Sequence, residues 1–232
     1  MKISEIYASL QGEGLLAGTP STFVRTSGCN LRCVWCDTPF TSWKPEGREM
    51  AVAEVLAAVE SHAPRHVVVT GGEPLLLAEA ADLCRELRGR GHHVTVETAG
   101  TVLPAADGPL FDLVSISPKL VSSTPPADTP GSWAARHDAA RRRDDVLRSL
   151  AASAPHQFKF VVETDADLAE ACDWLDDLGP VVDRGRVFFM PQARTAEELA
   201  SRTAWLAGEC HRRGVRLAPR HHITWFGNRR GT

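Results

Sequence analysis

The sequence predicts an α/β protein built around a parallel sheet, and two observations carry this prediction. Short runs rich in β-branched residues alternate with longer amphipathic stretches along the chain. Glycine-rich and polar segments follow the ends of the short runs. Repeated strand-then-helix units form an open doubly wound sheet or a full or partial barrel. At 232 residues we expect a single domain spanning residues 1–232.

The predicted strands share short β-branched or aromatic cores, and lie at residues 22–27, 66–70, 93–98, 111–117, 158–163 and 186–190. The predicted helices share an apolar period near 3.6, and lie at residues 50–62, 75–90, 165–179 and 195–214. Residues 121–133 are rich in Pro and Ser and predict a surface loop, followed by a charged helical stretch over residues 135–153. Within that stretch, Arg141–Arg143 precede Asp144 and Asp145, a pattern that favours a solvated helix face over a basic patch.

Composition limits the partners of the protein. The formal net charge is −3, from 26 Lys and Arg against 29 Asp and Glu, so no basic footprint for nucleic acid is present. The N-terminus lacks the apolar core of a signal peptide, and no run approaches the roughly 20 apolar residues that span a bilayer. We therefore expect a cytoplasmic protein with no membrane partner. Cys84, Cys172 and Cys210 lie in predicted helices, where we expect small buried hydrophobes.

Unusual loops follow five successive predicted strands, at residues 28–38, 71–74, 99–100, 117–119 and 191–192. The carboxyl ends of parallel strands meet at one edge of a sheet, where α/β proteins bind their ligands. We therefore expect a ligand site at this edge.

The first of these loops, "GCNLRCVWCDT", holds Cys29, Cys33 and Cys36. Structural zinc needs four ligands, and a redox Cys33–Cys36 dithiol leaves Cys29 without a role. An iron–sulfur cluster bound by three thiolates keeps one iron open to another molecule. The residues alone leave these three interpretations open.

The C-x3-C-x2-C spacing resembles that of the radical S-adenosylmethionine (SAM) enzymes. The resemblance implies a [4Fe-4S] cluster on Cys29, Cys33 and Cys36, with SAM on the fourth iron. "TGGEP" (residues 70–74) resembles the GGE motif of the superfamily, whose glycines let the main chain approach the cofactor. The alternative is a tight turn that places Glu73 and Pro74 in the first turn of a helix.

Further segments resemble one family, the 7-carboxy-7-deazaguanine synthases of the queuosine pathway. These segments are "SLQGEG" (9–14), "FVRTSGCNLRCVWCDT" (23–38), "TGGEP" (70–74), "SPK" (117–119) and "PRHHITWFGNRRG" (219–231). The resemblance implies a homodimeric partial (β/α) barrel of the radical SAM type. Its reaction contracts the ring of 6-carboxy-5,6,7,8-tetrahydropterin to 7-carboxy-7-deazaguanine with release of ammonia, and uses the cluster, SAM, Mg²⁺ and an electron donor such as flavodoxin.

The same resemblance assigns roles to individual residues. Arg25 matches the arginine that binds the substrate carboxylate, although it could be a surface residue. Thr38 matches the threonine that gives its hydroxyl oxygen to Mg²⁺, although it could be a helix N-cap. The other substrate contacts implied are Leu10, Gln11, Gly12, Thr70 and His222. The cofactor contacts implied are Trp35, Cys36, Asp37, Gly72, Ser117, Pro118 and Lys119.

A few nearby residues complete these expectations. Glu13, Gln157 and Lys159 are expected at the same edge as the site. Arg220 and His221 depart from the family pattern, and their roles stay open. His92 and His93 precede a strand at the opposite edge, where we expect both to be exposed.

Two rival functions remain. A glycyl-radical activase shares the cysteine spacing but needs neither "SLQGEG" nor Arg25. A zinc-binding α/β module without activity would give Thr38, "GGEP" and "SPK" no role.

Overall fold

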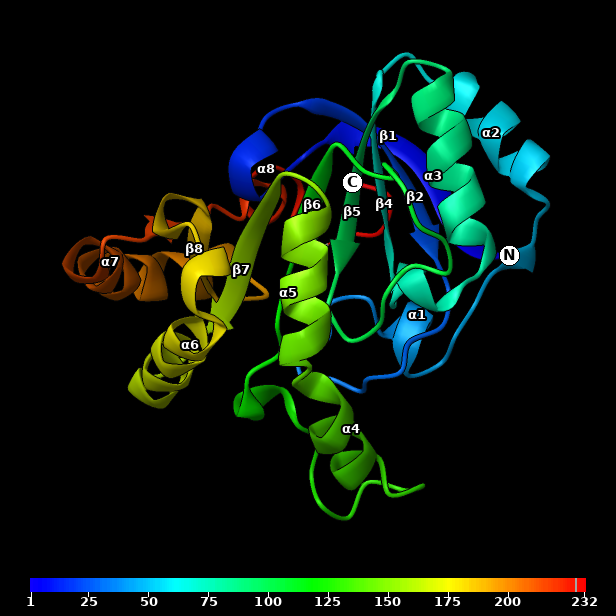
Figure 1. Ribbon diagram of the computed structural model, residues 1–232. Coiled ribbons are helices and arrows are strands. Elements are labelled where there is room, and N and C mark those ends of the chain that lie inside the picture. Colours follow the sequence, from blue (N-terminus) through cyan, green and yellow to red (C-terminus); the bar gives the residue numbers. More distant parts are fainter. Residues whose placement is uncertain (228) are drawn as a thin grey trace.

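A computed structural model describes residues 1–227 and 229–232, and its centre is one nine-stranded, mostly parallel sheet (Figure 1). Across the sheet the strands are β3 (Arg48–Glu49), β1 (Lys2–Leu10), β2 (Pro20–Thr26), β4 (His66–Gly71), β5 (His93–Thr98), β6 (Leu113–Ile116), β7 (His156–Val162), β8 (Val187–Pro191) and β9 (Arg216–Leu217). From β2 to β9 every neighbouring pair is parallel, whereas β1 is antiparallel to both β2 and β3. Because β3 and β9 are edges, the sheet stays open as a partial barrel, and the predicted α/β class is confirmed.

All six predicted strands are present, with ends shifted by up to two residues. β1 is an additional strand that the periodicity did not predict. Its polar residues interrupt the apolar pattern, and only Ile3 within it is buried. It is held by its register with β2, where Tyr7 lies opposite Phe23 and stacks on that ring at 5.2 Å between centroids.

The helices that cover the sheet lie within the predicted ranges, although α3 begins later than predicted because residues 74–76 form a 3-10 helix. They are α2 (Val52–Glu60), α3 (Glu79–Gly89), α5 (Asp144–Ser153), α6 (Asp165–Leu178) and α7 (Ala196–Arg213). Capping boxes start α6 at Thr164 and α7 at Thr195. Three shorter helices, α1 (Pro39–Ser42), α4 (Trp133–Arg141) and α8 (His221–Phe226), complete the set, and in Figure 1 α1 and α4 lie below the sheet. None of the helices described is both long and apolar enough to span a bilayer.

The charged stretch 135–153 forms two helices and not one. The chain leaves the helical conformation at Arg142 and Arg143, because the carboxylates of Asp144 and Asp145 start a second helix there. Each of Arg141, Arg142 and Arg143 is ion-paired, to Asp138, Asp144 and Asp145 respectively. Arg142 and Arg143 are exposed, as predicted for a solvated face, but they lie between the two helices, and the side chain of Arg141 is only 14% exposed.

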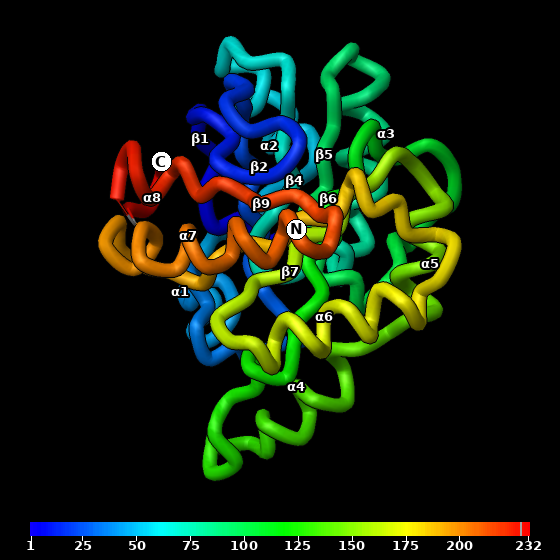
Figure 2. The backbone as a smooth tube through the Cα atoms, turned by 90° about the vertical axis from the view of Figure 1, so that its left-hand side faces the viewer, coloured from blue at the N-terminus to red at the C-terminus, as the bar shows by residue number. Residues whose placement is uncertain are grey.

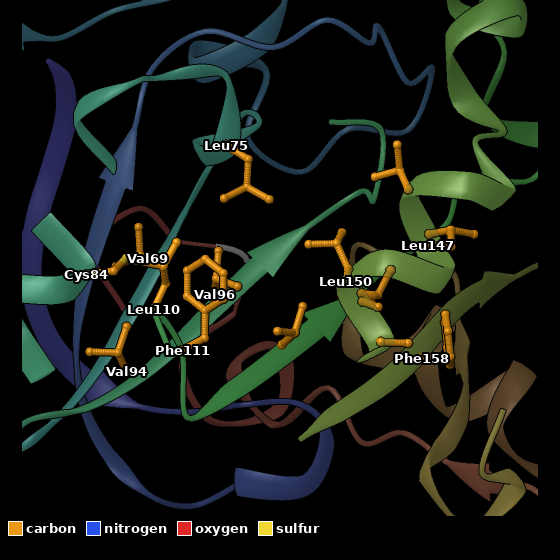
Figure 3. Close-up of a cluster of buried hydrophobic side chains, with 14 of the residues drawn as sticks. Val69, Leu75, Cys84, Val94, Val96, Leu110, Phe111, Leu147, Leu150 and Phe158 are labelled. Carbon is orange, nitrogen blue, oxygen red and sulfur yellow. The ribbon is translucent and has the colours of Figure 1, made fainter. Parts of the chain in front are cut away.

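The main core lies between the sheet and α3 and α5 (Figure 3). Val69, Val94 and Val96 from the strands lie toward Cys84 of α3, and Leu147 and Leu150 of α5 lie toward Phe158 of β7, all within one cluster. Burial of this apolar surface drives folding at about 25 cal/mol per Å². Figure 2 shows α5, α6 and α7 following one another around the molecule.

The predictions for the remaining cysteines and histidines have mixed outcomes. Cys84 and Cys210 are buried as predicted, and Cys172 is half-buried. His93 is exposed as predicted, but His92 is only 6% exposed, so that prediction is wrong. The reason is that the His92 backbone N–H donates to the carbonyl of Leu87 at the end of α3, which draws the residue under the helix.

Candidate active site

A cavity of about 520 Å³ opens at the carboxyl ends of the strands, a size typical of small-molecule sites. Its lining includes every predicted site residue except one. These are Leu10, Gln11, Gly12, Arg25, Cys29, Cys33, Trp35, Cys36, Asp37, Thr38, Thr70, Gly72, Ser117, Lys119 and His222. Pro118 is the exception: the flanking Ser117 and Lys119 line the cavity and Pro118 does not.

Close backbone packing holds the cysteine loop against the GGE loop. The Glu73 N–H donates to the carbonyl oxygen of Gly28 at 2.9 Å, and a Cβ on Gly72 would lie only 2.9 Å from the Cβ of Cys29. Gly72 therefore makes room for the cysteine loop, in addition to any approach to a ligand. The carboxylate of Glu73 is fully buried and accepts from Thr98 Oγ1 and the Ala99 N–H, which fixes the GGE loop to the end of β5.

The three thiols face the cavity from an apolar surround. Leu31 and Cys33 are buried, and Trp35 packs against them. Burial raises the pKa of the Cys29 thiol to about 11 and that of Cys33 to about 12. Both are therefore protonated in the metal-free protein, and binding a metal centre would release protons.

A single metal ion does not suit this arrangement. In the part of the chain that the structure describes, no three His, Cys, Asp or Glu side chains converge closely enough to hold one ion. A tetrahedral zinc ion needs all its ligands within about 2.3 Å. A four-iron cluster fits better, because each thiolate binds a different iron.

Thr38 precedes α1, yet its side chain does not cap that helix. Its hydroxyl accepts from Thr41 Oγ1 at 3.3 Å and lies 3.8 Å from Cys36 Sγ, at the cavity wall. Thr38 therefore stands at the N-cap position of α1, as the alternative held, although its side chain makes no capping bond. Its oxygen keeps lone pairs for another partner.

Arg25 lies on β2 and is held from two sides by β1. Its Nε donates to Glu5 at 2.7 Å and its Nη2 to the Tyr7 hydroxyl at 2.7 Å. The guanidinium is thus fixed at the cavity wall, and the alternative of a free surface arginine is wrong. Because Nε is already paired, an incoming carboxylate meets an arginine that shares its charge with Glu5.

A buried network of charges forms the cavity floor. Lys159 lies between Glu13 and Glu97, at 2.9 and 3.5 Å from their oxygens. Glu97 also accepts from Gln11 Nε2 at 3.2 Å and from Thr70 Oγ1 at 2.9 Å. Burial raises the pKa of the Glu13 carboxyl, but Lys159 and Arg220 outweigh it and hold that pKa well below its usual range. Glu13 is therefore a carboxylate at neutral pH.

The C-terminal segment closes the cavity from the opposite side. Arg220, only 6% exposed, donates to Glu13, to Asp37 and to the carbonyl of Ala193, so it joins the cysteine loop to the β1–β2 loop. His222 packs on Gly12, where a Cβ would lie 2.7 Å from its Nδ1. This assigns Arg220 to the site, whereas His221 stacks on Trp225 and does not line the cavity.

The other predicted neighbours have different positions. Lys119 Nζ donates to the carbonyl and hydroxyl oxygens of Ser117, so the two form one polar unit. Gln157 lies beside the site and accepts from the Leu15 N–H without lining the cavity. Asn228, within the matched C-terminal segment, lies outside the described residues.

Sequence reasoning missed Glu5, Tyr7 and Glu97. Glu5 and Tyr7 were missed because β1 itself was not predicted. Glu97 did carry a signal, because it is the one charged residue in the otherwise apolar and β-branched run "VTVET". A charge in a buried parallel strand is rare unless it is paired.

Comparison with known proteins agrees with this geometry. The radical SAM superfamily model matches residues 23–175. A 7-carboxy-7-deazaguanine synthase from Rhodopirellula baltica is 45% identical, with 99% of this chain and 88% of that protein covered. One from Halobacterium salinarum is 46% identical, with 98% of this chain and 91% of that protein covered.

A solved structure extends the comparison to the fold. The crystal structure of QueE from Escherichia coli superposes with a TM-score of 0.68 at 23% identity, covering 94% of this chain and 92% of that one. At this identity the likeness concerns the fold alone, whereas the curated relatives are close enough in sequence to define the family. The chain therefore belongs to the radical SAM superfamily and, within it, to the family of the 7-carboxy-7-deazaguanine synthases.

Proposed function

We propose that this protein converts 6-carboxy-5,6,7,8-tetrahydropterin to 7-carboxy-7-deazaguanine with release of ammonia, in a reaction that depends on SAM and Mg²⁺. Relatives of that name match nearly its whole length. The observation that carries the proposal is that three thiols, a fixed arginine and a buried carboxylate–lysine network line one cavity. A zinc-binding module would need neither the fixed arginine nor the carboxylate–lysine network.

Cys29, Cys33 and Cys36 would hold the [4Fe-4S] cluster. The Leu31 N–H donates to Cys29 Sγ at 3.4 Å, and such a bond favours the thiolate. Leu31 and Trp35 form an apolar wall beside the cysteines. With SAM bound, the reduced cluster would supply one electron to SAM, and the radical released from SAM would remove hydrogen from the substrate.

The surfaces beside the thiols are proposed to bind SAM. Gly72, packed against Cys29, and Trp35 both line the cavity. Ser117 and Lys119 offer hydroxyl and ammonium groups for ribose or carboxylate oxygens. Cys36 and Asp37 complete this proposed set.

The substrate would lie between the arginine and the charged floor. Arg25, fixed by Glu5 and Tyr7, suits the carboxylate. A pterin ring presents N–H donors and carbonyl acceptors, which suit Glu97 and Lys159 in turn. The residues proposed to surround the ring are Leu10, Gln11, Gly12, Thr70 and His222.

Thr38 is proposed as the one protein ligand to Mg²⁺. Its hydroxyl faces the cavity without a capping role, and the remaining ligands would come from water and the substrate carboxylate. Asp37 is engaged by Arg220 at 3.1 Å, so it serves to position the loop that carries Thr38.

The experiment is turnover by the anaerobically reconstituted protein. Reduced by dithionite, with SAM and Mg²⁺ present, it should convert the pterin to a product whose mass is that of 7-carboxy-7-deazaguanine, and about four iron and four sulfide should be bound per chain. A loaded cluster with unchanged pterin would refute the synthase and favour the activase. Zinc in place of iron would refute both.

The proposal includes the cellular setting. Six cysteines without disulfides suit the reducing cytoplasm. A homodimer and a flavodoxin-type electron donor are proposed from the family resemblance. Sedimentation of the purified protein tests the homodimer.

A further inference from the structure

Helix α4 lies below the sheet in Figure 1 and lines no part of the cavity. Three of its side chains nevertheless contact the cysteine loop or bring α4 against it. Trp133, His137 and Ala140 have the spacing i, i+4 and i+7, which places them on one face of the helix. The guanidinium of Arg32 lies over the Trp133 ring at 3.9 Å, and Ala140 packs against the apolar group that contains Cys33. One face of α4 is therefore turned toward the cysteine loop.

His137 bonds directly to the backbone of this loop. Its side chain is fully buried, and its Nδ1 accepts from the Arg32 N–H at 3.0 Å. Burial, together with the charges of Arg141 and Lys119, lowers the pKa of His137 to about 4, so the ring is neutral. Because Nδ1 accepts, Nε2 carries the proton and donates to Ser123 Oγ at 2.9 Å. The imidazole is thus fixed from both sides.

Ser123 also bonds to the loop on the other side of Cys33. Its carbonyl oxygen accepts from the Val34 N–H at 2.9 Å. Arg32 and Val34 are the residues immediately before and after Cys33. Both amides that flank this cysteine are therefore bonded to His137 and Ser123, and not to a sulfur atom.

The direction of these amides matters for an iron–sulfur cluster. An N–H that bonds to a cluster sulfur stabilises the reduced state, which carries one more negative charge, and so raises the reduction potential; exposure to water acts in the same direction. Cys29 Sγ accepts one such bond, from the Leu31 N–H at 3.4 Å. The sulfonium group of SAM accepts an electron only from a strong reductant, so a cluster that reduces SAM needs a low potential. Amides withheld from Cys33 favour that low potential.

We propose that His137 is a positioning residue that keeps the reduction potential of the cluster low, by holding the Arg32 amide away from the sulfur of Cys33. The proposal rests on the proposed function, which places a [4Fe-4S] cluster on the three cysteines. His137 does not line the cavity, and it acts on the cluster through the backbone of the loop.

The test compares two side-chain amides at position 137. His137→Asn places a carbonyl oxygen near the position of Nδ1, so it keeps an acceptor for the Arg32 N–H and loses the bond to Ser123. His137→Gln reaches the position of Nε2, so it keeps a partner for Ser123 and loses that acceptor. His66→Gln is the matched control, because His66 is also buried and bonded through both ring nitrogens, but it begins β4 at the end of the sheet away from the cysteine loop.

Each protein is reconstituted anaerobically, and the midpoint potential of its cluster is measured by a redox titration followed by electron paramagnetic resonance. This signal comes only from molecules that carry a cluster, so partial loss of iron does not disturb the measurement. We expect His137→Gln to shift the midpoint potential to a more positive value. His137→Asn and His66→Gln should keep the wild-type potential.

Two results would overturn the proposal. One is a wild-type midpoint potential in His137→Gln, and the other is an equal shift in His137→Asn, since that variant retains the acceptor for Arg32. A wild-type protein that binds no [4Fe-4S] cluster would instead refute the proposed function.

Discussion

Gly72→Ala should separate the two loops that form the cofactor side of the cavity. The new Cβ would lie 2.7 Å from the carbonyl carbon of Gly28 and 2.9 Å from the Cβ of Cys29, whereas ordinary contacts begin at 3.4 Å. The carbonyl oxygen of Gly28 would lie nearer still, so the loops must move apart by more than the roughly 0.7 Å that the carbonyl carbon alone requires. This movement stretches the bond from the Glu73 N–H to the Gly28 carbonyl, now 2.9 Å long.

The loss in the free energy of unfolding follows from these contacts. Overpacking costs about 1–3 kcal/mol, and loss of the hydrogen bond adds about 1 kcal/mol. We expect the free energy of unfolding to fall by about 2–4 kcal/mol in urea titrations of the cluster-free protein. The iron bound after reconstitution should fall in parallel, because Cys29 moves with the loop.

The matched control is Gly89→Ala in α3. No atom lies within 4 Å of a Cβ placed there, so this substitution should leave stability unchanged or raise it slightly. If Gly72→Ala unfolds at the wild-type urea concentration and binds a full complement of iron, the close approach of the loops is not what requires glycine at this position.

The remaining predictions concern pH, charge and metal. His66 is buried between Ser21 and Thr95, and burial lowers its pKa to about 4. As the pH falls, the unfolded chain binds a proton at this histidine before the folded protein does, so the free energy of unfolding should fall by up to about 3 kcal/mol from pH 6.5 to 4. His66→Gln should flatten this slope in urea titrations. An identical slope in the wild type and in His66→Gln would contradict this role of His66. Lys159→Met removes the cation beside Glu97 and leaves Glu13 paired with Arg220, and it should lower the unfolding free energy by about 3 kcal/mol. Wild-type stability of this variant would show that the network is not coupled. Thr38→Ala should retain iron and sulfide but raise the Mg²⁺ concentration for half-maximal turnover by about tenfold, and an unchanged Mg²⁺ response removes its role.

The parallel strands were predictable because they are buried on both faces and read as continuous apolar runs. The position of the cavity was predictable from these strands, because the loops that follow parallel strands meet at one edge of the sheet. β1 was not predictable in this way, because Ser4, Glu5 and Ser9 interrupt its apolar pattern. Its position depends on pairing with β2, a contact that periodicity does not report.

The charged floor of the site was only partly predictable. Lys159 and Glu13 were placed at the correct edge, but their partners come from segments far apart in the chain. The sequence around Arg220 did not indicate its role, because both carboxylates that it contacts lie in the N-terminal part of the chain. Tertiary pairing, and not local pattern, decides such contacts.

The contacts of Arg220 also bear on the order in which the cavity forms. Its bond to Glu13 spans 207 positions of the chain, so a translating ribosome finishes the cysteine loop long before the residue that closes the cavity emerges. Contacts of such high order form late, because loop-closure entropy opposes them. Until the C-terminal segment docks, the cavity beside the cysteine loop stays open on one side. Iron would therefore reach the three cysteines most easily before this segment docks.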